Sequence, residues 1–199
     1  MEYLSNTGRE RLGDALRESI DDDARLSIIA SYFTVFAYGE LKDELSKVDE
    51  LRFIFDEPTF ARQMESEKDP REFVVNRRSR EKGVGGTGLE LTLRNNLNQR
   101  ALARKCAEWA RERATFKSDK RRGMIATTGS YHVENAGSEN HALMGSAANA
   151  FSLEGLDYER KPGVVTGVSH FQTSAEAMGL KAMFDGIWGN PELVEDVTA

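Results

Sequence analysis

The sequence predicts an α/β fold in which helices join parallel strands, and three segments among the first sixty residues indicate it. Residues 25–30 (RLSIIA) form a short apolar run that is typical of a buried strand. Leu41, Leu45 and Val48 then recur at helical spacing, and residues 51–55 (LRFIF) form a second apolar run. Because a helix lies between two runs with short links, we expect the two strands to be parallel and joined by a crossover.

The other expected elements follow in chain order. Thr7 and Glu10 match a capping box, so a first helix is expected to run to about Ile20. Beyond the second strand, apolar spacing predicts a long helix over 91–113, strands at 115–117, 124–133, 142–145 and 164–168, and a helix that opens at a second capping box, 173–176. The predicted fold is therefore a mixed sheet flanked by helices.

The predicted domain covers residues 1–190, with a basic, Gly-rich insertion at about 60–90. Asn190 and Pro191 are typical of the N-cap and first turn of a helix. We therefore expect residues 191–199 to begin a helix that leads into a further, C-terminal region.

Composition narrows the class of protein. The 199 residues are 39% hydrophobic and 30% charged, as in an ordinary globular domain. No apolar run approaches the ~18 residues of a membrane span, and the opening residues lack the layout of a secretion signal. Cys106 is the single cysteine, so no internal disulfide can form. We expect a cytoplasmic protein that does not bind membranes.

Positive charge is concentrated in one part of a chain whose net charge is −6. From Arg71 to Arg122 there are fifteen lysines and arginines against six acidic residues. This asymmetry is typical of a cationic face that contacts phosphates, and equally of a solvated helix surface. The residues predicted to bind nucleic acid, most simply a DNA backbone, are Arg77, Arg78, Arg80, Lys82, Arg100, Arg104, Lys117, Lys120, Arg121 and Arg122.

Short motifs exclude several chemistries. Residues 83–88 read G-x-G-x-x-G, but a basic segment and not a strand precedes them, and the acidic residue about 20 positions on lies inside a predicted helix. No ATPase phosphate loop occurs, so ATP and Mg²⁺ are not expected to bind this chain. His132, His141 and His170 are too dispersed to predict a metal site.

The most specific stretch covers residues 142–156, ALMGSAANAFSLEGL. An apolar strand that leads into Gly-Ser and Asn, followed by Phe-Ser-x-x-Gly-Leu, resembles the end of the signature of phospholipase D-like domains. From about Tyr3 to Asn190 the layout is similar to the single phospholipase D-like domains found ahead of bacterial DEAD/DEAH-type helicases. The resemblance implies a phospholipase D/nuclease-like fold and a parent protein that hydrolyses ATP beyond these residues.

Members of that family cleave phosphodiesters with a His-x-Lys motif, in which the histidine attacks phosphorus. Alignment on Tyr131 puts Thr127 at the histidine position, Gly129 at the lysine position and Glu134 at the aspartate position. Ser146 and Asn149 remain of the Gly-Ser-x-Asn element, although Asn149 lies one residue too far along. Threonine and glycine cannot replace an imidazole nucleophile and an ammonium group, so the resemblance implies a catalytically degenerate domain.

Three functions stay open. The first is a degenerate domain that engages DNA or helps to assemble a larger ATP-dependent helicase. The second is an active phosphodiesterase or nuclease in which His132, or a partner chain, completes the site; Glu134 then occupies the lysine position. The third is a protein-interaction module that forms a homodimer.

Overall fold

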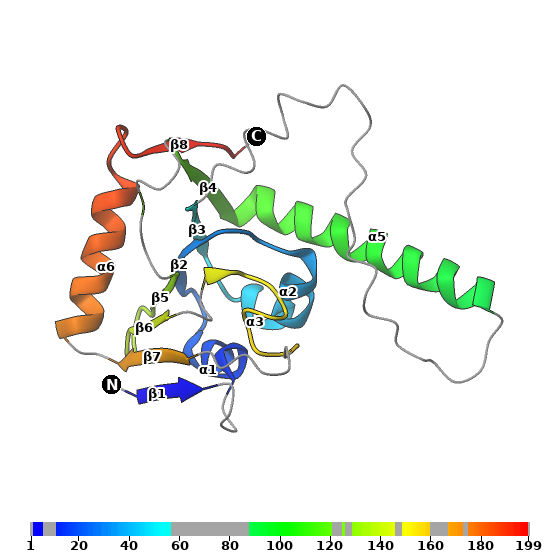
Figure 1. The fold of residues 1–199 in the computed structure, drawn as a ribbon, viewed down its shortest axis with the longest axis horizontal. Helices are drawn as coiled ribbons and strands as arrows, with labels where there is room; N and C mark the ends of the chain where they lie inside the picture. The colour runs from blue at the N-terminus through cyan, green and yellow to red at the C-terminus, as the bar shows by residue number, and fades with distance from the viewer. Residues whose placement is uncertain are drawn as a thin grey trace.

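The computed structural model describes residues 2–5, 11–56, 88–120, 125, 129–145, 149–159, 167–172 and 175–198, and every structural statement concerns these residues. Their elements, shown in Figure 1, are β1 (Glu2–Ser5), α1 (Leu12–Ser19), β2 (Arg25–Ala30), α2 (Val35–Glu40), α3 (Lys42–Leu45), β3 (Glu50–Phe55), α5 (Gly88–Arg113), β4 (Ala114–Asp119), β5 (Ser130–Glu134), β6 (His141–Gly145), β7 (Gly167–Gln172), α6 (Ala175–Trp188) and β8 (Val194–Asp196).

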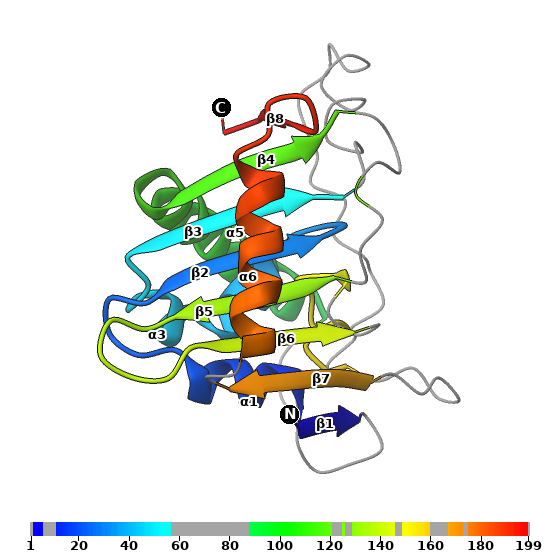
Figure 2. The same ribbon diagram turned by 90° about the vertical axis from the view of Figure 1, so that its left-hand side faces the viewer.

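The eight described strands belong to one mixed sheet with the order β1-β7-β6-β5-β2-β3-β4-β8, drawn in Figure 2. β2, β3 and β4 are parallel to one another, and the remaining pairs are antiparallel. Helices α2 and α3 connect β2 to β3, as the short links predicted. The expectation of a mixed α/β sheet flanked by helices is therefore confirmed.

Helices cover both faces of the sheet (Figures 1 and 2). α1, α2, α3 and α5 lie on one face, and α6 crosses the other. Because side chains alternate along a strand, β3 serves both layers: Phe53 belongs to the larger core on the first face, and Ile54 packs with Phe184 of α6 on the second. The side chains of the neighbouring strand β2 are divided between the two cores in the same way.

The long helix α5 is fixed to the body by its second half. Leu102 packs on the larger core, the ring centroids of Trp109 and Tyr38 are 5.3 Å apart, and Trp109 Nε1 donates a hydrogen bond to the carbonyl oxygen of Leu45 at 3.0 Å. The amino-terminal part extends beyond the sheet in Figure 1. No helix in the described part of the chain is both long and apolar enough to span a bilayer.

Several predicted boundaries are wrong. α1 begins at Leu12 with Arg11 at its N-cap, whereas the predicted cap, Thr7, lies outside the described residues. α2 was not predicted, because its aromatic and β-branched residues resemble a strand; Thr34 caps it by accepting a hydrogen bond from Ala37 N at 3.2 Å. β5 begins at Ser130 and not at 124, and β7 extends past the expected end at 168. Most of the predicted insertion at 60–90 lies outside the described residues.

The predicted helix at 191–199 is also wrong. Asn190 Oδ1 accepts a hydrogen bond from Glu192 N at 2.9 Å and so forms a turn, after which β8 pairs with β4. Val194 is buried in the smaller core beside Phe184. Strand pairing and the burial of Val194 outweigh the local helix signal, and the segment belongs to the sheet. The reason for placing a domain boundary at Asn190 disappears with the helix.

Candidate functional site

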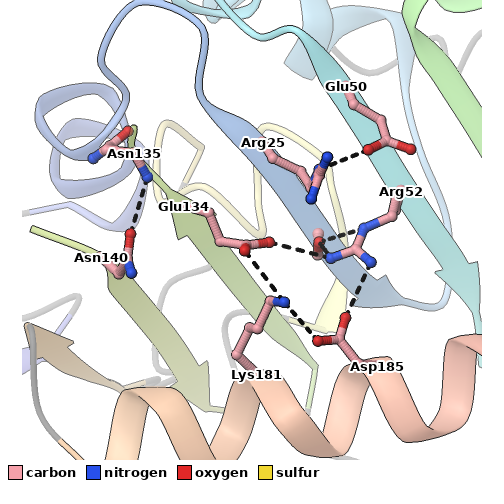
Figure 3. A network of polar contacts seen from close by, with 9 residues as sticks. Arg25, Glu50, Arg52, Glu134, Asn135, Asn140, Lys181 and Asp185 are labelled. Atoms are coloured by element: carbon pink, nitrogen blue, oxygen red, sulfur yellow. Dashed lines mark hydrogen bonds and ion pairs between the residues drawn. The ribbon is translucent and has the colours of Figure 1, made fainter. Parts of the chain in front are cut away.

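Four charged side chains meet between the sheet and α6, as Figure 3 shows. Arg52 lies in the middle of β3, Glu134 ends β5, and Lys181 and Asp185 are one turn apart on α6. Arg52 lies 3.3 Å from Glu134 and 3.0 Å from Asp185. Lys181 Nζ lies 3.2 Å from Glu134 and 2.5 Å from Asp185. Each cation contacts both carboxylates, so the network ties α6 to two strands.

Arg52 is the most deeply buried member of this network, with 9% of its surface exposed. Its Nε and Nη2 atoms donate hydrogen bonds to Ser27 Oγ at 3.0 and 2.7 Å. The guanidinium carbon lies 5.0 Å from the ring centroid of Phe184 and 5.8 Å from that of Trp188, within cation–π range. A buried cation is stable only when it is paired and hydrogen-bonded, and Arg52 meets both conditions.

The surroundings keep the α6 pair ionised. Partial burial would raise the pKa of Asp185, but the hydrogen bond from Lys181 and the charge of Arg52 outweigh burial and hold that pKa below its ordinary value. Burial would likewise lower the pKa of Lys181, but hydrogen bonds to Asp185 and Glu134 raise it. A general acid or base needs a pKa near the working pH, and both groups titrate far from neutrality. Neither member of the α6 pair is therefore suited to proton transfer, and the network anchors α6.

His132 lies under α6 beside the network and is 1% exposed. Its Nε2 atom is 3.1 Å from Ser130 Oγ, and its ring centroid is 5.8 Å from that of Phe184. The pKa of His132 is lowered to about 4, mainly by burial and also by the charges of Arg52 and Lys181, against the opposing effect of Asp185. The imidazole is neutral at pH 7 and borders a cavity beside α6, but almost none of its surface is open to a phosphodiester. This geometry argues against His132 as a nucleophile.

A cavity of about 260 Å³ opens next to the network, between the first half of α6 and the β5–β6 hairpin. Its charged walls are Glu134, Lys181 and Asp185, which already pair with one another. Among the described residues, no group of three or more histidine, cysteine, aspartate or glutamate side chains is placed to hold a metal ion. The cavity thus lies beside the network, and its charged walls supply no activated nucleophile.

Two of the positions that align with the family's catalytic motif lie at the two ends of β5. Gly129 precedes β5 with a φ of 32°, and Glu134 ends the same strand, where it faces Arg25 at the start of β2. Five residues of strand place them about 17 Å apart, at opposite ends of the sheet. Glu134 is held in the charged network there. Thr127 lies outside the described residues.

The remnant of the Gly-Ser-x-Asn element lies at the other end of the sheet from Glu134. Asn149 is exposed, and its carbonyl oxygen accepts a hydrogen bond from Ser31 N at 2.8 Å, just past the end of β2. Gly145 ends β6 so close to β7 that a Cβ would lie 2.3 Å from the carbonyl oxygen of Gly167. The close approach of β6 and β7 therefore explains why the motif has a glycine at position 145. Ser146 lies outside the described residues.

The predicted basic groove is described only in part. Arg100 and Arg104 are exposed on α5. Lys117 does not join them: its Nζ donates to the carbonyl oxygen of Trp188 at 2.8 Å and lies 4.4 Å from that ring centroid, on the α6 face. Lys120 Nζ donates to the carbonyl oxygen of Pro191 at 2.5 Å. The other six predicted cations, Arg77, Arg78, Arg80, Lys82, Arg121 and Arg122, lie outside the described residues.

The sequence analysis missed Arg52, Lys181 and Asp185. One signal was available for Arg52, because a charged residue inside an apolar strand has to be paired when the strand is buried on both faces. Its partner Asp185 is 133 residues away, so the pairing itself could not be read from the sequence.

Comparison with protein-family models gives no match to this chain, and no curated protein shows significant similarity to it. The resemblance to phospholipase D-like domains therefore depends on the motifs in the sequence alone.

Proposed function

We propose that this chain is a catalytically inactive domain of the phospholipase D-like type that binds the phosphate backbone of a nucleic acid along α5. The observation that carries the binding function is a stripe of exposed arginines, Arg100, Arg104 and Arg111, hereafter the arginine stripe. The larger helicase in which such a domain would work belongs to the same proposal and depends on the resemblance alone.

The geometry of α5 supports this function. At 3.6 residues per turn, the arginine stripe occupies an arc of about 40°, opposite the side on which Leu102 and Trp109 pack against the body. No other residue between Arg100 and Arg111 falls in that arc, so no carboxylate interrupts the stripe. The three arginines form no ion pair among the described residues. Bidentate guanidinium groups suit phosphate oxygens.

The length of the stripe matches a nucleic-acid backbone. The eleven helical rises from Arg100 to Arg111 span about 17 Å, which corresponds to roughly five base-pair steps of duplex DNA. Contacts of this kind neutralise phosphates without reading the bases, so binding is expected to be independent of sequence.

The absence of catalysis is supported by three positions in and beside β5. Gly129 carries no side chain to hold a phosphoryl oxygen, Glu134 is held in the charged network at the opposite end of β5, and His132 is buried. The sheet is mixed and flanked by helices, and β6, which ends at Gly145, lies next to β5. This arrangement is compatible with the layout that the resemblance implies.

The test combines binding and cleavage in one set of samples. Fluorescence anisotropy with a labelled 20-base-pair duplex, the matching single strand and an RNA duplex is measured from 50 to 300 mM KCl. Three phosphate contacts predict that log K falls against log[KCl] with a slope of about −2.7 or steeper. Gel analysis after a day is expected to show intact strands. Cleavage that His132→Gln abolishes, or an affinity independent of salt, would contradict the proposal.

A protein-interaction module is the second candidate, and one observation favours it. Met178 and Met183 of α6 are exposed, with 68% and 38% of their surfaces accessible. Sedimentation velocity without nucleic acid distinguishes this candidate: a stable dimer that ignores the duplex would favour it over the backbone-binding function.

A further inference from the structure

Two histidines on neighbouring strands direct ring nitrogens at each other. His141 begins β6, and His170 lies in β7, where its backbone pairs with Leu143. His141 and His170 are thus diagonal neighbours on one face of the sheet, close enough for their side chains to meet. His141 Nδ1 lies 3.1 Å from His170 Nε2, and the ring planes differ by 34°.

We propose that His141 and His170 together bind a divalent transition-metal ion of the kind that prefers imidazole ligands, Cu²⁺, Ni²⁺ or Zn²⁺. Imidazole nitrogens at 2.0–2.1 Å from a tetrahedral Zn²⁺ are separated by about 3.3–3.4 Å. The two nitrogens here need to move apart by a few tenths of an ångström, and the two rings have to turn so that both lone pairs point at one ion. This inference is independent of nucleic-acid binding along α5.

The site offers two protein ligands. The described residues hold no cluster of three or more metal-ligating side chains, so water or an external ligand completes the coordination sphere. An ion held in this way exchanges with solution, unlike one in a closed structural site. By the Irving–Williams order, Cu²⁺ binds more tightly than Ni²⁺ or Zn²⁺.

The surroundings favour a cation. The carboxylates of Glu139 and Asp21 act electrostatically on His141, and both carry negative charge toward the site. His141 is half-buried, so its ring is partly accessible from solvent.

Binding requires a lone pair on both facing nitrogens. In the metal-free pair, one ring donates its N–H to the other across the 3.1 Å contact. The metal takes both lone pairs, and the donated proton transfers through solvent to the second nitrogen of its own ring. A neutral pair therefore binds the ion without net proton release.

The test uses the untagged full chain after treatment with a chelator. Isothermal titration with ZnCl₂ and NiCl₂ is expected to show one ion per chain. His141→Gln and, separately, His170→Gln should weaken the affinity about tenfold or more, whereas His132→Gln, which removes a histidine outside the pair, should leave it unchanged. His141 is the partly exposed member, so its replacement keeps the core intact even where replacement of His170 does not.

Electron paramagnetic resonance of the chain with one equivalent of Cu²⁺ supplies a readout that does not depend on stability. Hyperfine coupling to two imidazole nitrogens is expected, and to one in His141→Gln. Equal affinity in all three variants, or a Cu²⁺ spectrum that His141→Gln leaves unchanged, would show an adventitious ion and overturn the proposal.

Discussion

At the scale of single residues, Arg52 is a cation placed in an apolar strand, where two carboxylates neutralise its charge and a serine accepts further hydrogen bonds. Ser27, Glu134 and Asp185 all receive its hydrogen bonds. Arg25 at the start of β2 and Glu50 at the start of β3 form a contrasting ion pair, because they are 2.7 Å apart but largely exposed. The ion pairs of Arg25 and Arg52 therefore differ in burial, although they lie within a few residues of each other.

We predict that Arg52→Met lowers the free energy of unfolding by about 2 kcal/mol, because Glu134 and Asp185 lose their cation. Breaking a fully buried pair costs more, about 3–5 kcal/mol, but both carboxylates keep some access to water. Urea denaturation measures the change. Arg25→Met is the control and should cost less than about 1 kcal/mol. Equal losses in the two variants would show that the network does not anchor α6.

His132 links stability to pH. Its pKa is about 4 in the folded chain, against an ordinary value of 6.5 for histidine, so the unfolded chain binds more protons between these values. The stabilisation from a neutral His132 is complete above pH 6.5 and is lost as the pH falls toward 4. Between pH 7 and pH 5 it amounts to about 2 kcal/mol.

We therefore predict that His132→Gln loses about 2 kcal/mol less stability than the wild type between pH 7 and pH 5. Urea midpoints at pH 7, 6 and 5 measure the difference. Parallel pH profiles for the two chains would mean that the buried imidazole does not control acid sensitivity.

At the scale of elements, glycines show where two segments approach closely and where they do not. Gly145 ends β6 against the backbone of β7, where a Cβ has no room, whereas Gly179 lies in α6 with open space around the corresponding position. We predict that Gly145→Ala destabilises the fold by about 1–3 kcal/mol, because the two strands have to separate. Gly179→Ala should instead stabilise it by about 0.5–1 kcal/mol through helix propensity.

Thermal unfolding of the two glycine variants tests this contrast. A Gly145→Ala chain as stable as the wild type would mean that β6 and β7 are less closely packed at this point. The Gly-Ser part of the motif at 145–146 would then need another explanation.

The elements that the sequence predicted correctly are those with a local cause. β2 and β3 are mostly apolar runs, because strands buried on both faces favour apolar residues; the polar exceptions Ser27 and Arg52 are hydrogen-bonded to each other. β8 was predicted as a helix because Asn190 and Pro191 are a local signal, whereas its actual partner, β4, lies more than seventy residues away. The charged network was not predicted for the same reason, because Arg52 and Asp185 come together only in the folded chain.

At the scale of the whole molecule, positive charge and the core occupy different sides of α5. An acidic chain of net charge −6 still presents three arginines on the side of this helix opposite its packing contacts. Because the arginine stripe faces solvent, a polyanion can approach it without rearranging the sheet. The stripe could be predicted from spacing in the sequence, but its exposure required the packing of Leu102 and Trp109.

The salt dependence of duplex binding by a stripe-deficient chain tests the central claim most directly. In Arg100→Ala/Arg104→Ala/Arg111→Ala, the slope of log K against log[KCl] should become shallower by about 2.7, since each lost phosphate contact removes about 0.9. Lys42→Ala/Lys47→Ala removes exposed charge elsewhere and should keep the wild-type slope. Identical slopes for the wild type and the stripe variant would contradict the account.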